Sequence, residues 1–115
     1  MSKVDIVKNI EGDIYEVKVS GDVDASSSIH LDNALEEAFT AKEKKVLINL
    51  QEMNYISSAG LGVFIARLEE VKMQGIQLSF CELQPNVKQV FALLGLEELL
   101  SIYDSREDAI SAYSK

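Results

Sequence analysis

The sequence has few of the residues from which catalytic and metal centres are built. Its 115 residues include one histidine (His30), one cysteine (Cys81), one proline and no tryptophan. One cysteine cannot form an internal disulfide, and together with one histidine it cannot supply a tetrahedral zinc site. A Gly-x-Ser-x-Gly nucleophile motif is absent, and Gly60-Leu61-Gly62 lacks the third glycine of a dinucleotide-binding loop because Ile65 occupies that position. We therefore expect no enzyme, no metal and no cofactor.

Long apolar runs and an excess of basic residues are absent too. No stretch approaches the roughly 20 apolar residues that span a bilayer, and the first residues lack the apolar core of a signal peptide. The net charge is −8, and the eleven basic residues are scattered, which opposes binding to nucleic acids and to anionic membranes. We expect a cytoplasmic protein that binds neither nucleic acids nor membranes. We also expect it to fold as a single domain over residues 1–115.

The hydrophobic pattern predicts a hairpin followed by alternating strands and helices. Tyr15, Val17 and Val19 alternate with Glu16 and Lys18, so the second strand is expected to turn these two charged residues to water. The fold class is therefore α/β, a mixed sheet covered by about four helices. We expect strands at about 4–9, 14–20, 46–50, 76–81 and 99–103, and helices marked by Leu31 to Phe39, at about 58–73, from Pro85 to Gly95 and after Ser105.

The segment from Asn54 to Phe64 is the most informative part of the chain, because it places two serines at the start of an amphipathic helix. The expected buried face of that helix carries residues at spacings of three and four. The free N–H groups and the dipole of a helix start favour a phosphate on Ser57 or Ser58. Serine is also a preferred helix cap with a purely structural role. Both interpretations remain open at this point. The expected face consists of Leu61, Phe64, Ile65, Leu68 and Val71.

Two loops share one position in the predicted fold. The segments Gly21-Asp22-Val23-Asp24 and Ile56-Ser57-Ser58-Ala59-Gly60 each follow a strand and precede a helix. If their strands are neighbours, the loops lie side by side, and acidic residues then frame a serine. A small acidic chain without catalytic machinery is better interpreted as a binding module than as an enzyme.

Four segments, taken in order and at their spacing, resemble the STAS domain family, and within it the bacterial anti-sigma factor antagonists. The likeness covers nearly the whole chain and implies a single STAS domain with a STAS-like mixed sheet. The segments are Val19-Ser20-Gly21-Asp22-Val23-Asp24, Val46-Leu47-Ile48-Asn49-Leu50, Ser57-Ser58-Ala59-Gly60-Leu61-Gly62, and the helix with Val87, Phe91, Gly95 and Leu96.

The resemblance implies a switch controlled by phosphate. In such antagonists the serine aligned with Ser58 is phosphorylated by a serine-kinase anti-sigma factor. The unphosphorylated form binds that kinase and frees the sigma factor, and a metal-dependent serine phosphatase resets the system. We expect a monomer or a weak dimer. The partner-binding residues implied by the alignment are Asp22, Asp24, Asn49, Ser57, Ser58, Ala59, Gly60 and Gly62.

The chain departs from the family pattern at one position, where Ser57 stands in place of the usual aspartate. This change makes Ser57 a second candidate for the phosphorylated serine. It also leaves two other functions open. One is an adaptor or scaffold that binds its partners without phosphorylation, and the other is a sensor of nucleotides or small anions at the helix start.

Overall fold

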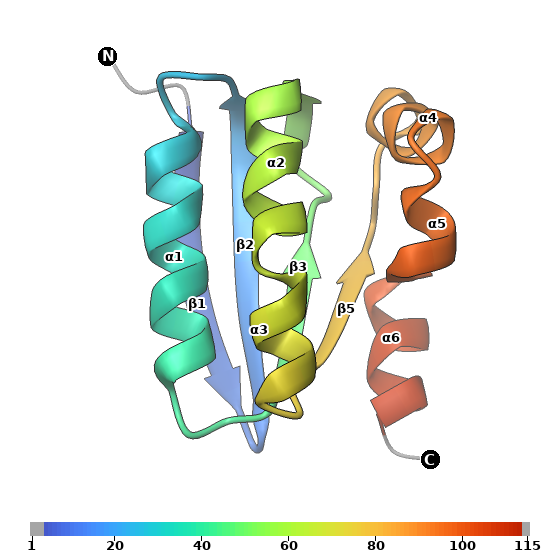
Figure 1. Cartoon of the computed structure of the whole chain (residues 1–115). Coiled ribbons are helices and arrows are strands. Elements are labelled where there is room, and N and C mark those ends of the chain that lie inside the picture. Colours follow the sequence, from blue (N-terminus) through green and yellow to red (C-terminus); the bar gives the residue numbers. More distant parts are fainter. Residues whose placement is uncertain (1–3, 114–115) are drawn as a thin grey trace.

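The computed structural model describes residues 4–113, which form a mixed sheet with helices on both faces (Figure 1). The strand order is β1-β2-β3-β5-β6, and β4 pairs with β2 beyond the end of β3. The strands are β1 (Val4–Glu11), β2 (Ile14–Val23), β3 (Lys45–Asn49), β4 (Met53–Ile56), β5 (Gln77–Cys81) and β6 (Ser101–Tyr103). The helices are α1 (Ser28–Thr40), α2 (Ser58–Ala66), α3 (Leu68–Met73), α4 (Pro85–Leu93), α5 (Leu96–Leu99) and α6 (Arg106–Tyr113).

The predicted hairpin is confirmed. Strands β1 and β2 pair antiparallel up to Glu11 and Ile14, so only Gly12 and Asp13 form the turn. Gly12 has φ of +63°, a left-handed conformation that glycine adopts without steric cost. All later pairings are parallel. The predicted mixed sheet, which begins with a hairpin, is thus confirmed.

Strand β4 was not predicted, and it decides where the loops lie. Its residues Met53 and Ile56 are buried whereas Asn54 and Tyr55 are exposed, a pattern without the strict alternation that marks a strand. The long strand β2 pairs with β3 along its first half and with β4 at its end, after a register shift between Gly21 and Asp22. Strand β4 therefore runs directly beside the end of β2.

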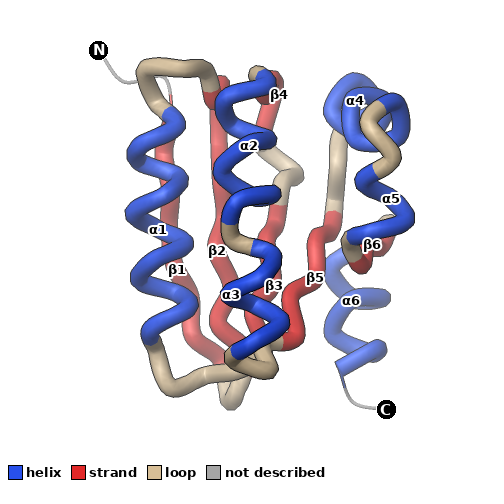
Figure 2. Tube along the Cα trace, in the orientation of Figure 1, coloured by secondary structure: helices blue, strands red, loops and turns tan. Residues whose placement is uncertain are grey.

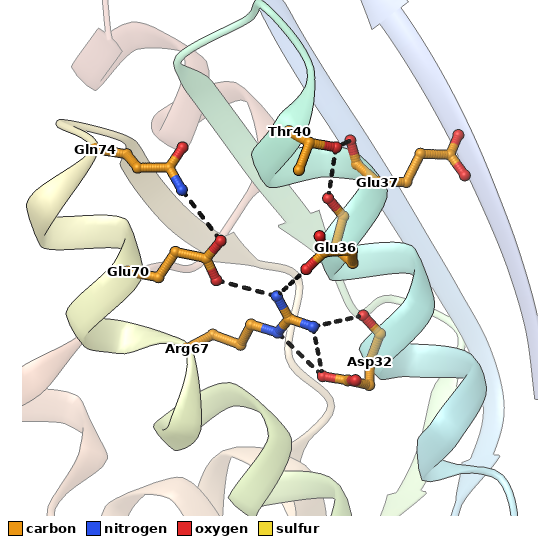
Figure 3. A network of polar contacts seen from close by, with 7 residues as sticks. All are labelled: Asp32, Glu36, Glu37, Thr40, Arg67, Glu70 and Gln74. Atoms are coloured by element: carbon orange, nitrogen blue, oxygen red, sulfur yellow. Dashed lines mark hydrogen bonds and ion pairs between the residues drawn. The ribbon is translucent and has the colours of Figure 1, made fainter.

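Helices α1, α2 and α3 cover one face of the sheet (Figure 2), and α6 covers part of the other. The helix predicted over 58–73 is correct in extent but divided at Arg67, whose N–H bonds to Phe64 O in a tightened turn. The Arg67 guanidinium bridges α1 and α3 (Figure 3). Its contacts are Asp32 (2.9 Å), Glu36 (2.6 Å) and Glu70 (3.0 Å), and these bonds, the one to Glu36 above all, raise its pKa.

The main core lies between the sheet and the helices α1 to α4. The rings of Phe64, Phe80 and Phe91 pack edge to face, with centroids 5.0 and 5.9 Å apart. Of the expected buried face of the 58–73 helix, Leu61, Phe64 and Val71 are buried and Leu68 is half-buried, but Ile65 is 46% exposed, so the buried stripe is narrower than expected.

A smaller apolar cluster lies under α6 and contains Leu47, Cys81, Ala109 and Tyr113. Cys81 is fully buried in this cluster, and its burial raises the pKa of the thiol to about 12. A thiol of this kind is a poor nucleophile at neutral pH.

Most predicted helix ends are confirmed. Gly75 and Gly95 follow the ends of α3 and α4 with φ of +68° and +71°, and Pro85 is the first residue of α4. The short helix α5 was not predicted and shortens the last strand to Ser101–Tyr103. Among residues 4–113, six helical segments rather than the expected four or so thus surround the sheet. None of them, within residues 4–113, has the length and hydropathy to cross a membrane.

Candidate functional site

The two loops singled out in the sequence lie side by side at one end of the sheet. Val23 of β2 is the register partner of Ile56 of β4, and the N–H of Ser57 donates to Val23 O at 2.8 Å. Helices α1 and α2 both begin at this end (Figure 1). The predicted adjacency is therefore confirmed, and the new strand β4 produces it.

Ser57 and Ser58 are neighbours with different environments. Ser57 is the N-cap of α2: it is half-buried, has an extended backbone, and its Oγ accepts the N–H of Gly60 at 3.2 Å. Ser58 is the first residue of the helix and is exposed. Within residues 4–113 its Oγ has no hydrogen-bond partner. Capping thus falls to Ser57, and Ser58 keeps a free hydroxyl.

The glycines of this helix start have separate functions. Gly60 is buried, and a Cβ atom there would lie 2.8 Å from both Ile56 Cγ1 and Val23 Cγ1. The absence of a side chain lets α2 sit directly on strands β2 and β4. Gly62 has open space around it, and Ala59 is exposed beside Ser58. Gly60 is therefore required for packing, whereas Ala59 and Gly62 place no bulky side chain on the surface beside Ser58.

The carboxylate of Asp24 shapes its own loop. Its Oδ1 accepts hydrogen bonds from the N–H and hydroxyl groups of Ser26 (3.0 and 2.7 Å) and of Ser27 (3.0 and 3.1 Å). These bonds, that of the Ser26 hydroxyl first, lower the pKa of Asp24. The N-cap residue of α1 is Ser27, whose side chain makes no capping hydrogen bond to the helix, so the bonds of Asp24 order the loop that leads into α1.

Asp22 differs from Asp24 although both are half-buried. Its backbone oxygen accepts the hydroxyl of Ser27 at 3.1 Å, but its carboxylate has no hydrogen bond or ion pair within residues 4–113. Asp22 is the register partner of Tyr55, whose side chain is 50% exposed. Asp22 thus has the freer of the two loop carboxylates.

Asn49 lies apart from this surface, since only 5% of it is exposed. Its Nδ2 donates to Glu16 Oε2 at 2.9 Å, and its Oδ1 accepts the N–H of Gln51 at 3.0 Å. Arg106 Nε also donates to Glu16, at 2.9 Å, and this bond raises the pKa of Arg106. A partner contact of Asn49 remains a prediction. In the structure, its side chain makes hydrogen bonds inside the protein, to Glu16 and Gln51.

Glu16 corrects the sequence interpretation of its strand. Alternation predicts that Glu16 and Lys18 face water, and Lys18 is indeed exposed, but Glu16 is only 1% exposed. The physical reason is α6, which covers this part of the sheet and supplies the guanidinium of Arg106. Ninety residues separate the two partners, so no local pattern marks the pair.

Sequence reasoning also missed the residues that hold the loop before β4. Gln84 Nε2 donates to Gln51 O and Asn86 Nδ2 donates to Asn54 O, both at 2.7 Å. These bonds attach the start of α4 to the segment that leads to Ser57. Pro85 marks this helix start in the sequence, but nothing local indicates where the flanking amides bind.

Metal and cofactor chemistry receives no support from the described residues. Between residues 4 and 113, no three His, Cys, Asp or Glu side chains gather in a way that would hold a metal ion. His30 is exposed at the start of α1, as expected for an ordinary surface histidine. The absence of a metal and of a cofactor stays a prediction.

Comparison with known proteins gives a consistent result. The model of the STAS domain family matches residues 5–109. BtrV of Bordetella bronchiseptica, named as a candidate anti-sigma factor antagonist, is 30% identical over 83% of this chain and 82% of its own length. The anti-sigma F factor antagonist of Paenibacillus polymyxa is 25% identical over the same shares. Among solved structures, an anti-sigma factor antagonist from Mycobacterium paratuberculosis superposes with a TM-score of 0.89 at 20% identity, covering 97% of this chain and 95% of that one.

Proposed function

The chain belongs to the STAS domain family, and from that premise we propose that it is an anti-sigma factor antagonist controlled by phosphorylation of Ser58. The observation that carries the proposal is that Ser57 and Ser58 lie in different environments. Ser57 Oγ is engaged in capping α2, whereas Ser58 Oγ is exposed and without a hydrogen-bond partner among residues 4–113. A kinase needs such an accessible hydroxyl.

The helix start favours the phosphorylated form locally. Ser58 lies in the first turn of α2, where backbone N–H groups lack partners within the helix and the helix dipole attracts negative charge. A phosphoserine carries about −1.5 to −2 charges at neutral pH. We therefore expect the phosphate to leave the fold intact.

The same phosphate opposes binding of a partner. Asp22 and Asp24 belong to the neighbouring loop, so the added charge enters a surface that is already acidic. An interface penalty of about 3 kcal/mol lowers affinity about a hundredfold. Asp22, Asp24, Ser57, Ala59 and Gly62 complete the proposed contact surface around Ser58, with Gly60 and Asn49 supporting it from inside.

The proposed cycle has three partners. The unphosphorylated protein binds a serine-kinase anti-sigma factor and releases the sigma factor, the kinase inactivates it by modifying Ser58, and a metal-dependent serine phosphatase restores it. The protein itself acts by binding in the cytoplasm and catalyses no reaction.

The test is the affinity of three proteins for the cognate serine-kinase anti-sigma factor. We expect Ser58→Asp to bind about a hundredfold more weakly than the wild type, with its thermal midpoint nearly unchanged. Ser111→Asp is the matched control, because it adds the same charge at an exposed serine of α6.

Two results would contradict the proposal. Equal affinities of wild type and Ser58→Asp would favour an adaptor that is not regulated by phosphorylation. The presence of Ser57 in place of the family's usual aspartate is consistent with that alternative. A large loss of stability in Ser58→Asp would mean that this serine serves the helix start rather than a switch.

A further inference from the structure

Strand β1 is the most exposed element of the sheet. It forms one edge, pairs with β2 on its inner side, and within residues 4–113 no strand pairs with its outer side. In a strand, every second residue directs its N–H and C=O groups away from the inner neighbour. An edge of eight residues without proline is long enough to pair with a further strand.

The side chains of β1 add apolar surface on both faces of this edge. Val7 is 51% exposed on one face, and Ile10 is 47% exposed on the other. Lys8, the type of residue that usually protects an edge, is tied to Glu37 of α1 at 2.6 Å. A groove of about 490 Å³ follows the same edge beneath α1, lined by Ile6, Lys8, Tyr15, Val17, Ala34 and Glu37 among others.

We propose that β1 pairs antiparallel with β1 of a second copy of this chain, about a two-fold axis at Val7. The two sheets then join into one continuous sheet. The argument for a second copy as the occupant is the self-complementarity of the strand sequence Val4-Asp5-Ile6-Val7-Lys8-Asn9-Ile10 in this register.

The register follows from the side chains that come to face each other. Val7 meets the second copy's Val7 at the axis, and Asp5 meets Asn9, whose amide can donate to the carboxylate. On the α1 face, Ile6 meets the aliphatic stem of Lys8, and Ile10 meets Val4. Cross-strand pairs of these kinds stabilise a sheet, and no like charges are opposed.

Neighbouring symmetric registers are worse. With the axis at Lys8, this lysine would face its own copy, and Asp5 would face Glu11 on both sides of the axis, so that like charges meet three times. With the axis at Ile6, Asp5 would face Val7, and Ile10 would lie beyond the described part of the other copy's strand, which begins at Val4. Only the register centred on Val7 joins residues 4–10 throughout and covers both exposed apolar side chains.

The proposed dimer is closed, because each copy uses its β1 edge for the other. Its axis reverses the strand direction, so the two Ser58 loops lie at opposite ends of the joined sheet. Each copy therefore keeps its loop free for a partner, and the dimer presents two such loops.

Disulfide formation tests the register. In Val7→Cys the two new thiols face each other with Cα atoms about 4.5–5.5 Å apart, within the range of a disulfide. In Ile10→Cys, an equally exposed position of the same strand, the two thiols are six residues out of register, about 20 Å apart. The native Cys81 is buried and does not compete. We expect a reducible covalent dimer of Val7→Cys under mild oxidation and at least tenfold less of Ile10→Cys. Equal yields would overturn the register.

Sedimentation velocity over a range of concentrations tests the dimer itself. We expect a reversible monomer–dimer equilibrium, weakened at least tenfold by Val7→Lys, which places two like charges at the axis. Ile29→Lys, at a position that is 56% exposed on α1, is the matched control and is expected to associate like the wild type. A wild type that stays monomeric at the highest soluble concentration, or equal weakening by both variants, would overturn the proposal.

Discussion

Two clusters of polar residues lie at different depths of this molecule. Around Glu16, on the face covered by α6, the carboxylate oxygens are bound by Asn49 and Arg106, and within residues 4–113 no buried side-chain nitrogen or oxygen lacks a partner. Around Ser58, the serine hydroxyl and the Asp22 carboxylate have no partner in the described chain. Paired polar groups hold the fold, and the groups left free are those that a partner protein can use.

Removal of Arg106 gives the largest expected effect. Arg106→Met leaves the buried Glu16 with one hydrogen-bond donor and no counter-charge, and we expect the free energy of unfolding to fall by about 3 kcal/mol. Urea denaturation measures it. The double variant Glu16→Met/Arg106→Met is expected to be more stable than Arg106→Met, because no unpaired charge remains buried. A double variant that is no more stable would contradict this account of the cluster.

Substitution of Asn49 separates support of the fold from partner contact. Asn49→Ala removes a donor to Glu16 and the acceptor of the Gln51 N–H, so we expect a loss of about 2 kcal/mol in the free energy of unfolding. Binding of the folded variant to the anti-sigma factor is expected to match that of the wild type. A stable variant with weakened binding would instead place Asn49 in the interface.

The two serines should differ by a smaller amount. Ser57→Ala removes the cap of α2 and is expected to cost about 1 kcal/mol. Ser58→Ala removes an exposed hydroxyl and is expected to change stability by less than about 0.5 kcal/mol. Paired thermal and urea denaturation checks both values. An equal or reversed order would show that the free and bound hydroxyls have been assigned to the wrong residues.

The smallest effect concerns acid pH. The pKa of Asp24 is lowered in the folded protein, so its stabilising bonds are complete above its unfolded pKa and are lost as pH falls through the folded value, below 3.8. Asp24→Asn should therefore lose less stability than the wild type in this acidic range. Thermal midpoints of both proteins across it provide the measurement, and parallel curves would contradict the assignment.

Local signals in the sequence were sufficient for much of the fold. Gly12 and Asp13 mark the hairpin turn, Pro85 and Gly95 bound a helix, and the apolar residues of β3 define a buried strand. The adjacency of the two loops was predicted on the condition that their strands are neighbours, and the pairing of β2 with the unpredicted strand β4 meets that condition.

The remaining features depend on residues far apart in the chain. Glu16 is buried by Arg106 of α6, and the break at Arg67 coincides with its bonds to Asp32 and Glu36 of α1. Strand β4 forms because β2 continues beyond the end of β3. The roles of individual residues within the site could not be predicted either. The sequence does not show that Ser57 caps α2 or that the Asp24 carboxylate binds its own loop.

The most direct test of the central claim is the mass of the protein after incubation with ATP and its cognate serine-kinase anti-sigma factor, followed by peptide mapping. We expect one added phosphate, located on Ser58, absent in Ser58→Ala and retained in Ser57→Ala. Phosphate on Ser57, or no phosphate despite tight binding of the kinase, would contradict the assignment of the free hydroxyl as the switch.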